Sequence, residues 1–257
     1  MANYTIDTLP ALSDNYIFII RDKVSDLTLC IDPGDAKIVI NYLEANNLKL
    51  DYILNTHHHY DHITGNQELL ERYNCKIFAN SKDVYRINSV TDELTEGQIL
   101  QLGIFNFKIL ATPGNAINHI SYHDEKLKLL FSGDTIFSSG CGRIIEGNHE
   151  MLYDSLDKLS KLDEETVIYF AHEYTKKNIE FALQFEPSNQ DLINKYQDTI
   201  NKYAKNTPTV PTTLGNELKT NPFLRLHNKE IRKNLDFNSD HLSFKVLKKL
   251  RTLKDKY

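Results

Sequence analysis

One segment constrains this chain more than any other, a histidine cluster that directly follows a short apolar run. Residues 56–62 read Thr56-His57-His58-His59-Tyr60-Asp61-His62 and place five potential metal ligands within six residues. The preceding Tyr52-Ile53-Leu54 predicts a short buried strand. In an extended segment residues 57 and 59 point the same way and can reach one ion, while Asp61 and His62 on the following turn can reach a second. Imidazole and carboxylate without thiolate suit zinc, iron or manganese and argue against a structural zinc finger.

Three more potential ligands stand at the ends of predicted strands farther along the chain. His119 ends the segment Thr112-Pro113-Gly114-Asn115-Ala116-Ile117-Asn118-His119, Asp134 ends Phe131-Ser132-Gly133-Asp134, and His172 lies in Ala171-His172-Glu173-Tyr174. An aspartate at a strand end is more often a turn or capping residue than a ligand. The shared position after a strand makes the set a candidate site, because ligand sites gather at such loops.

The first two thirds of the chain alternate short apolar runs with turn signals, which predicts an α/β body. Strands are expected over 4–9, 16–20, 28–31, 52–54, 77–78, 105–110, 127–131 and 167–170, and a helix over 38–46. The segment Asp32-Pro33-Gly34 reads as a turn. Strands mixed with single helices indicate two packed sheets with helices outside them.

The pattern changes after residue 170. Apolar residues at helical spacing predict helices over 175–185 and 188–205, with Ser188 as the N-cap of the second, and a basic amphipathic helix from Asp240 to Tyr257. Residues 208–222, rich in Pro and Thr, are expected to be irregular. The net charge is −11 over residues 1–172 and +6 over residues 173–257. We therefore predict a metal-binding domain over 1–172 and an α-helical, substrate-binding domain over 173–257.

Composition excludes several classes of protein. With 257 residues, 40% hydrophobic and 25% charged, the chain is neither disordered, collagen-like nor a disulfide scaffold. The longest apolar stretch near the start, residues 16–20, is far too short to span a bilayer, and no basic residue precedes it as in a secretory signal. The three cysteines form no C-x-x-C pair, which is typical of a reducing compartment, so we expect a cytoplasmic protein. We also expect no membrane partner, and we take a monomer as the default oligomeric state.

Together these motifs resemble the metallo-β-lactamase superfamily and, within it, the glyoxalase II (hydroxyacylglutathione hydrolase) family. The histidine run, the T-P-G segment, S-G-D-T and the late histidine specify only the superfamily. The narrower resemblance rests on Gly140-Cys141-Gly142-Arg143, Ala171-His172-Glu173-Tyr174-Thr175, Asn221-Pro222-Phe223 and Arg251-Thr252-Leu253-Lys254-Asp255. It covers nearly the whole chain and implies a four-layer αββα sandwich followed by a small all-α C-terminal domain.

The resemblance also assigns roles to residues. One metal would be held by His57, His59 and His119, and the other by Asp61, His62 and His172. Asp134 would bridge the two, so Asp61 and Asp134 are the carboxylates expected at the reacting centre, and His58 would be a structural neighbour. The implied cofactors are two divalent ions, zinc first, with iron or manganese also compatible. The predicted substrate-binding residues are Arg143, Ile144, Ile145, Tyr174, Arg251 and Lys254.

The implied activity is hydrolysis of a small-molecule glutathione thioester. S-D-lactoylglutathione and other 2-hydroxyacylglutathiones would be converted to D-lactate, or the matching acid, and glutathione, in the second step of methylglyoxal detoxification. A hydroxide bound to both metals would attack the thioester carbonyl, because metal ions lower the pKa of a bound water towards neutrality. The basic C-terminal part suits the two carboxylates of glutathione.

The chain departs from the family pattern at four positions that bear on this reading. Asn115 stands where the family has a histidine that is not a ligand, so the ligand set stays complete and only the side chains that orient it are affected. Ala116 replaces a threonine. Asn118 replaces a glycine and is expected to hold a positive φ angle. Ile145 replaces a tyrosine or phenylalanine, which removes one expected contact to the peptide part of the substrate.

Three alternatives stay open at this point. A persulfide dioxygenase, lactonase or β-lactamase has the same fold, but a dioxygenase would need only two histidines and an aspartate, and a lactonase or lactamase would not need the basic tail. A nucleic-acid-processing protein is disfavoured because the tail carries only +6 and no aromatic residues alternate with its basic loop residues. A catalytically inactive relative is disfavoured by the complete ligand set.

Overall fold

The computed structural model describes residues 3–87, 89–237 and 242–257. The chain forms two compact units, one of residues 1–111 and 118–133 and the other of residues 112–117 and 134–257. The predicted domains, 1–172 and 173–257, divide the chain elsewhere and remain a prediction.

The first unit contains a sheet with the strand order β1-β2-β3-β4-β5-β6. Its strands are β1 (Tyr4–Ala11), β2 (Asn15–Asp22), β3 (Leu27–Ile31), β4 (Tyr52–Leu54), β5 (Lys76–Asn80) and β6 (Asp92–Leu94). β1, β2 and β3 pair antiparallel, whereas β3, β4, β5 and β6 run parallel. Because parallel neighbours end at the same edge, the turn after β3 and the histidine cluster after β4 lie side by side, and Asp32 N donates to Leu54 O at 3.1 Å.

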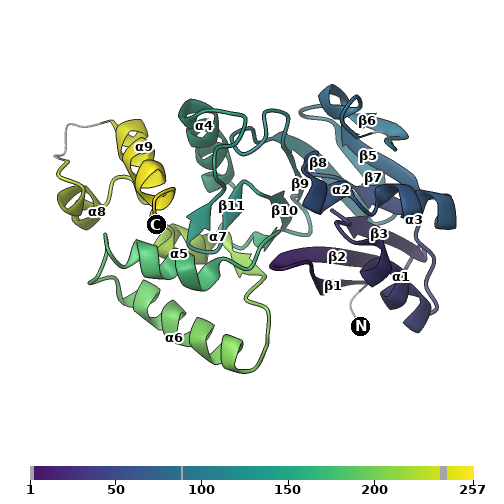
Figure 1. Cartoon of the computed structure of the whole chain (residues 1–257), viewed down its shortest axis with the longest axis horizontal. Helices are drawn as coiled ribbons and strands as arrows, with labels where there is room; N and C mark the ends of the chain where they lie inside the picture. Colours follow the sequence, from purple (N-terminus) through teal and green to yellow (C-terminus); the bar gives the residue numbers. More distant parts are fainter. Residues whose placement is uncertain (1–2, 88, 238–241) are drawn as a thin grey trace. The chain divides into compact units, whose positions relative to one another are not determined.

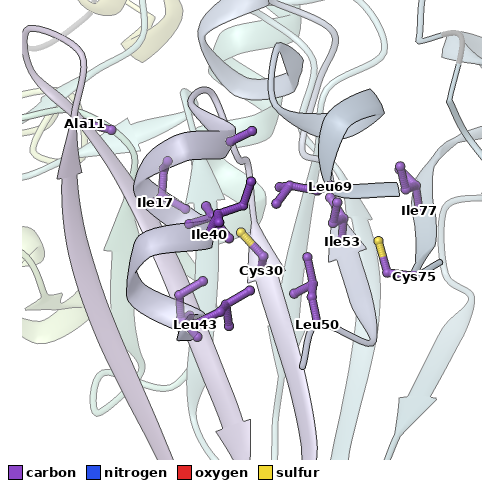
Figure 2. Packing of buried hydrophobic residues seen from close by; sticks show 13 residues of the cluster. Ala11, Ile17, Cys30, Ile40, Leu43, Leu50, Ile53, Leu69, Cys75 and Ile77 are labelled. Carbon is purple, nitrogen blue, oxygen red and sulfur yellow. The ribbon is translucent and has the colours of Figure 1, made fainter. Parts of the chain in front are cut away.

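Helices cover one face of this sheet. Side chains of α1 (Ala36–Ala45) and α3 (Asn66–Tyr73) pack on residues of β2, β3, β4 and β5, as Figure 2 shows for Ile40, Leu43 and Leu69 beside Ile17 and Ile53. Asp35 caps α1 by accepting from two backbone N–H groups of its first turn, which starts the helix directly after the Asp32-Pro33-Gly34 turn. This packing holds the strands whose ends carry the candidate ligands.

A second sheet of the same unit packs on the other face of the first. Its strands in this unit are β7 (Ile99–Leu102), β8 (Phe105–Ala111), β9 (Ile120–Asp124) and β10 (Leu129–Gly133), in the antiparallel order β10-β9-β8-β7. Aromatic rings join the two sheets, with Phe18 against Phe131 at 5.8 Å and Tyr4 against Phe105 at 5.6 Å between ring centroids. The predicted helix-flanked pair of sheets is therefore present in this unit.

The second unit is mainly helical (Figure 1). A short hairpin, β11 (Ile136–Phe137) with β12 (Gly140–Cys141), accompanies its helices, as does an antiparallel pair of strands far apart in sequence, β13 (Val167–Phe170) with β14 (Thr212–Thr213). The helices are α4 (His149–Ser160), α5 (Thr175–Ala182), α6 (Gln190–Ala204), α7 (Leu214–Thr220), α8 (Lys229–Asn234) and α9 (Ser243–Lys254). α5 and α6 lie side by side, and Ile179, Ala182 and Leu192 form a small buried cluster.

The sequence-based expectations for this part of the chain were wrong or incomplete at four points. Residues 208–222 are not irregular throughout, because they include α7, which Thr213 caps by accepting from Asn216 N and whose Glu217 is buried. Asn189, not Ser188, caps α6. α4 was not predicted. The predicted C-terminal helix begins at Ser243, and its expected first residue, Asp240, lies outside the described residues.

None of the helices in the described part of the chain is long and apolar enough to cross a membrane.

Candidate metal centre and substrate loop

All five predicted ligands of the first unit come together. His57 lies at the centre of the imidazoles, with ring centroids at 4.5 Å from His59, 4.1 Å from His62 and 4.8 Å from His119. Nε2 of His57 is 2.9 Å from Nδ1 of His59. Nε2 of His62 is 3.5 Å from Oδ2 of Asp61. The spacing in the sequence therefore predicted that these imidazoles and this carboxylate lie close together; their role as metal ligands stays a prediction.

Asp32 and Thr56 determine which ring nitrogens carry protons. The hydroxyl of Thr56 donates to Asp32 Oδ2 at 2.7 Å, so it can only accept from Nδ1 of His57, 3.0 Å away. Oδ2 of Asp32 also lies 3.1 Å from Nδ1 of His62. The hydrogen bond from His57 places its ring proton on Nδ1 and leaves the lone pair on Nε2, an arrangement in which a histidine can bind a metal. The Asp32 carboxylate beside Nδ1 of His62 favours the same form of that ring electrostatically.

Burial favours the neutral, ligating form of His57. Its ring is 1% exposed, and burial lowers its pKa well below the ordinary range. The neighbouring imidazoles of His62, His119 and His59 lower the pKa further, because a second positive charge beside them would be unfavourable. Neutral imidazoles and a carboxylate, with no thiolate among them, fit a divalent cation such as zinc, iron or manganese.

Two further residues hold the cluster in place. Asn15 Nδ2 donates to Oδ2 of Asp61 at 2.9 Å and to the Asp61 carbonyl at 3.2 Å. Gly133 has a φ of +49°, and a Cβ there would lie 2.6 Å from Nε2 of His119 and 2.5 Å from Oγ1 of Thr56. Only glycine leaves room for the His119 ring at this point.

His58 and Asn118 belong to a neighbouring polar cluster. Nδ1 of His58 is 3.6 Å from Oδ2 of Asp83, and its Nε2 is 3.1 Å from Nη1 of Arg86. Asn118 Nδ2 donates to Oδ1 of the same aspartate at 2.7 Å, and its carbonyl accepts from Asn80. The expected positive φ of Asn118 was wrong, because these hydrogen bonds hold it without a left-handed backbone.

The second unit contains the other two predicted ligands, Asp134 and His172. Nε2 of His172 is 3.2 Å from Oδ1 of Asp134. The His172 ring stacks on Tyr174, with centroids 5.0 Å apart and planes at 4°. Phe137 of β11 meets both rings edge-on, at 5.9 Å from His172 and 5.4 Å from Tyr174. Aromatic packing therefore orients His172 from the side of the β11–β12 hairpin.

Asn115 anchors the loop that contains the predicted substrate-binding residues Arg143, Ile144 and Ile145. Its Nδ2 donates to Arg143 O at 3.0 Å, and its carbonyl accepts from Ile145 N at 3.2 Å and Glu146 N at 3.1 Å. Glu146 in turn accepts from Ile117 N at 3.1 Å. The residue that departs from the family pattern thus holds three points of the loop after β12.

Arg251 is buried rather than presented to solvent. Its Nη1 donates to Cys141 O at 2.9 Å and Gly142 O at 3.4 Å, and its Nη2 donates to Asp255 at 3.0 Å. The guanidinium also lies 5.5 Å from the centroid of Phe223. Arg251 therefore supports the backbone of β12, directly before Arg143.

Arg143 and Lys254 are the more accessible cations. The Arg143 side chain is 70% exposed, and its Nε lies 3.8 Å from Asp255. Lys254 donates to Lys177 O at 3.0 Å and lies over the rings of Phe181 and Tyr257. Burial, and after it the nearby charge of Arg251, lower the pKa of Lys254 to about 8.

Sequence reasoning missed the residues that orient the ligands. Asp32 was interpreted only as part of a turn, and Thr56 and Asn15 were not selected. Their one available signal was position, since Asp32 follows β3, whose parallel neighbour β4 leads into the histidine cluster.

Comparisons with known proteins agree with this geometry. Residues 6–172 match the model of the metallo-beta-lactamase superfamily, and the crystal structure of the BLEG-1 B3 metallo-beta-lactamase superposes with a TM-score of 0.67 at 23% identity, covering 86% of this chain and 100% of that one. The predicted fold, a metallo-β-lactamase body followed by a helical C-terminal part, is confirmed.

The C-terminal part and the curated relatives narrow the class. Residues 173–257 match the model of the hydroxyacylglutathione hydrolase C-terminus. A hydroxyacylglutathione hydrolase of Pelagibacter ubique is 42% identical over 220 residues, 86% of this chain and 92% of that protein. One of Maricaulis maris is 38% identical over 257 residues and covers 100% of both. Within the metallo-β-lactamase superfamily, the chain therefore belongs to the hydroxyacylglutathione hydrolase family. The family and the clusters of histidine and aspartate point to a divalent metal site.

Proposed function

We propose that the chain hydrolyses the thioester of S-D-lactoylglutathione and other 2-hydroxyacylglutathiones, the second step of methylglyoxal detoxification. Water is consumed, the C–S bond breaks, and a 2-hydroxy acid and glutathione are released. The observation that carries the proposal is the 38% identity to a hydroxyacylglutathione hydrolase over all 257 residues. Thioester hydrolysis is what that protein's name describes.

The proposed cofactors are two divalent cations, zinc first. His57, His59 and His119 would hold one, Asp61, His62 and His172 the other, and Asp134 would bridge them. The support is the donor set itself, which supplies neutral imidazoles with Nε2 lone pairs and two carboxylates. When bound, such ions supply a water of lowered pKa and polarise the thioester carbonyl.

The residues of the chain have three tasks in this reaction. Asp32 and Thr56 keep the histidine rings in their ligating orientation, and Asn15 restrains Asp61. Burial of the His57 and His119 rings keeps bulk water away from the ligands. The leaving group is a thiolate, which needs little protonation, so the chain requires no separate general acid.

The proposed substrate contacts come from the second unit. Arg143 and Lys254 would meet glutathione carboxylates, with the backbone of Ile144 and Ile145 and the ring of Tyr174 beside the thiol peptide. Arg251 would act through the Cys141–Gly142 backbone that it supports. The exposed Ile145 would give a weaker contact than an aromatic residue.

We also propose a monomer in a reducing, cytoplasmic setting. Cys30, Cys75 and Cys141 are free and buried, as a reducing compartment permits. Size-exclusion chromatography with light scattering tests the monomer.

A substrate panel tests the proposed activity. Purified, zinc-loaded chain is expected to hydrolyse S-D-lactoylglutathione with a far higher kcat/KM than a lactone or a β-lactam. It should consume no oxygen with glutathione persulfide. A preference for the lactone or the β-lactam, or oxygen uptake, would replace the proposal with one of the alternatives.

A further inference from the structure

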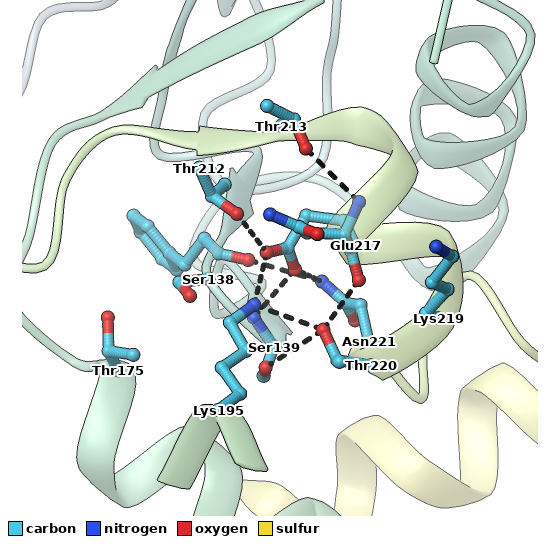
Figure 3. A network of polar contacts seen from close by, with 12 residues as sticks. Ser138, Ser139, Thr175, Lys195, Thr212, Thr213, Glu217, Lys219, Thr220 and Asn221 are labelled. Atoms are coloured by element: carbon cyan, nitrogen blue, oxygen red, sulfur yellow. Dashed lines mark hydrogen bonds and ion pairs between the residues drawn. The ribbon is translucent and has the colours of Figure 1, made fainter. Parts of the chain in front are cut away.

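A fully buried carboxylate in the second unit has no place in the reaction just described. Glu217 of α7 is 0% exposed, and its two oxygens accept four hydrogen bonds. Oε1 accepts from Lys195 Nζ at 2.5 Å and Thr212 Oγ1 at 2.8 Å. Oε2 accepts from Ser139 N at 2.7 Å and Asn221 Nδ2 at 3.1 Å. Figure 3 shows these contacts converging on the Glu217 carboxylate. All lone-pair directions of the anion are used.

The network ends on the tip of the β11–β12 hairpin. Ser139, in the tip, has a left-handed φ of +54°, and the Glu217 carboxylate fixes its N–H. Asn221, which follows α7, donates to Phe137 O at 3.1 Å and Gly140 O at 2.9 Å, on both sides of the tip. Asn178 of α5 donates to Ser138 O at 3.1 Å. A strained turn persists only where its surroundings determine it, and here buried side chains do so.

The β11–β12 hairpin contacts residues of the proposed site, so the placement of its tip affects theirs. Asp134 lies two residues before the hairpin and Arg143 two residues after it, and Gly142 N donates to Thr135 O at 3.1 Å to close its base. A Cβ at Gly142 would lie 1.9 Å from the Asp134 carbonyl, so the two backbones are in direct contact. Phe137, whose carbonyl Asn221 holds, packs on His172 and Tyr174. The hairpin therefore links both predicted ligands of this unit to the buried network.

We propose that Glu217 and Asn221 are positioning residues: by holding the tip of the β11–β12 hairpin they set the placement of Asp134, His172 and Arg143. This role rests on the proposed function, because it concerns the metal ligands and the substrate cation named there. It gives α7 a task in the reaction, although α7 contains none of the proposed ligands or substrate contacts.

Two double variants separate this role from a general effect on stability. Glu217→Gln/Lys195→Met removes both charges but keeps a side-chain oxygen for Ser139 N and Asn221. Glu217→Met/Lys195→Met removes both charges and that oxygen. The two have the same net charge, and neither leaves a charge of this pair buried alone, so they differ chiefly in the acceptor for the hairpin tip.

The expected results follow from the acceptor. In the full-length chain, Glu217→Gln/Lys195→Met should keep zinc affinity, measured by competition with a chromogenic chelator, within about twofold of the unmodified chain. Glu217→Met/Lys195→Met should weaken it by roughly 10- to 100-fold, as for other residues that orient ligands. It should also raise the KM for S-D-lactoylglutathione.

The ion pair of buried Glu186 and partly exposed Arg225 provides the control. Arg225 donates to Glu186 at 2.8 Å and to Leu218 O of α7 at 3.0 Å, in the same unit, rather than to the hairpin. Glu186→Met/Arg225→Met should lower Tm by several degrees and leave zinc affinity unchanged. If Glu217→Met/Lys195→Met does not fold, Asn221→Ala makes the same test, because it removes the donors to Phe137 and Gly140, and it too should weaken zinc binding.

Two results would overturn the inference: equal zinc affinity in the Gln and Met double variants, or an equal loss in the Glu186/Arg225 control. A chain that binds zinc as expected but does not hydrolyse the thioester in any form would instead defeat the proposed function. The zinc measurements would still decide the role of Glu217.

Discussion

The two compact units hold their candidate residues by opposite means. In the first, four of the five predicted ligands lie within residues 57–62, and the side chains that orient them follow neighbouring strands. In the second, the relevant residues are spread from Asn115 to Lys254 and depend on contacts between segments far apart in sequence, such as Arg251 with Cys141. Local spacing thus builds the imidazole cluster, whereas long-range packing builds the substrate loop.

The largest effect is expected when a proposed metal ligand of the first unit is replaced. Replacing His59 by Ala removes an imidazole that lies against His57, so zinc content and thioester hydrolysis should fall together, with activity reaching background. Asp134→Ala in the second unit should do the same. Metal analysis of the purified variants, paired with the hydrolysis assay, makes the measurement.

His58→Ala is the matched control, because it changes the adjacent histidine, whose partners are Asp83 and Arg86. It should retain zinc and most of the activity. A fully active His59→Ala chain without metal would refute the ligand assignment.

The next effect concerns orientation within the first unit. Asp32→Asn removes the carboxylate that fixes the protons of His62 and Thr56, and zinc affinity should fall roughly 10- to 100-fold. Asp124→Asn is the control, because the Asp124 carboxylate is equally buried and accepts from the backbone N–H groups of Asn106 and Leu127. This variant should leave zinc affinity unchanged. Equal affinities of the two variants would mean that Asp32 does not orient the ligands.

In the second unit, the effects should appear in KM. Arg143→Gln removes an exposed cation and should raise the KM for S-D-lactoylglutathione by about tenfold, the order of one hydrogen bond to a charged group. The KM for S-lactoyl-N-acetylcysteamine, a thioester without carboxylates, should not change. A parallel rise for both substrates would argue against a contact to glutathione.

Lys254 should make binding depend on pH. Because burial lowers its pKa to about 8, its ammonium is lost as the pH rises through 8, and KM should rise between pH 7 and pH 9. Lys254→Arg keeps its charge and should flatten this profile. The free energy of unfolding should change in the opposite direction and increase with pH. Because the pKa of Lys254 is about 8 in the folded chain and 10.5 in the unfolded chain, its contribution to stability is complete above pH 10.5 and is lost as the pH falls through 8.

The smallest effect is expected at Asn115, one of the residues that depart from the family pattern. Asn115→Ala removes one of the three hydrogen bonds that hold the Arg143 loop, while the two made by its carbonyl remain. KM should rise about threefold to tenfold, as the loss of one hydrogen bond suggests, and zinc affinity should stay the same. A loss of zinc instead would assign Asn115 to the metal ligands rather than to the loop.

These contrasts explain what the sequence could predict. Periodicity and turn signals predicted most strands, and the close spacing of His57, His59 and His62 predicted a cluster that the first unit contains. The resemblance, not spacing, singled out Arg251, and nothing local indicates that its guanidinium is buried under β12. Asp32 was interpreted as a turn residue, and α7 was not predicted because it lies in a Pro/Thr-rich stretch. Their roles depend on hydrogen bonds and ion pairs with residues of other strands and helices, which local sequence does not indicate.

The most direct test of the account is a zinc titration of the chelator-treated, full-length chain with S-D-lactoylglutathione as substrate. We expect no hydrolysis without metal, a rise to full activity at two equivalents of zinc per chain, and no recovery in Asp134→Ala. Full hydrolysis by the metal-free chain, or two bound zinc ions without any thioester hydrolysis, would contradict it.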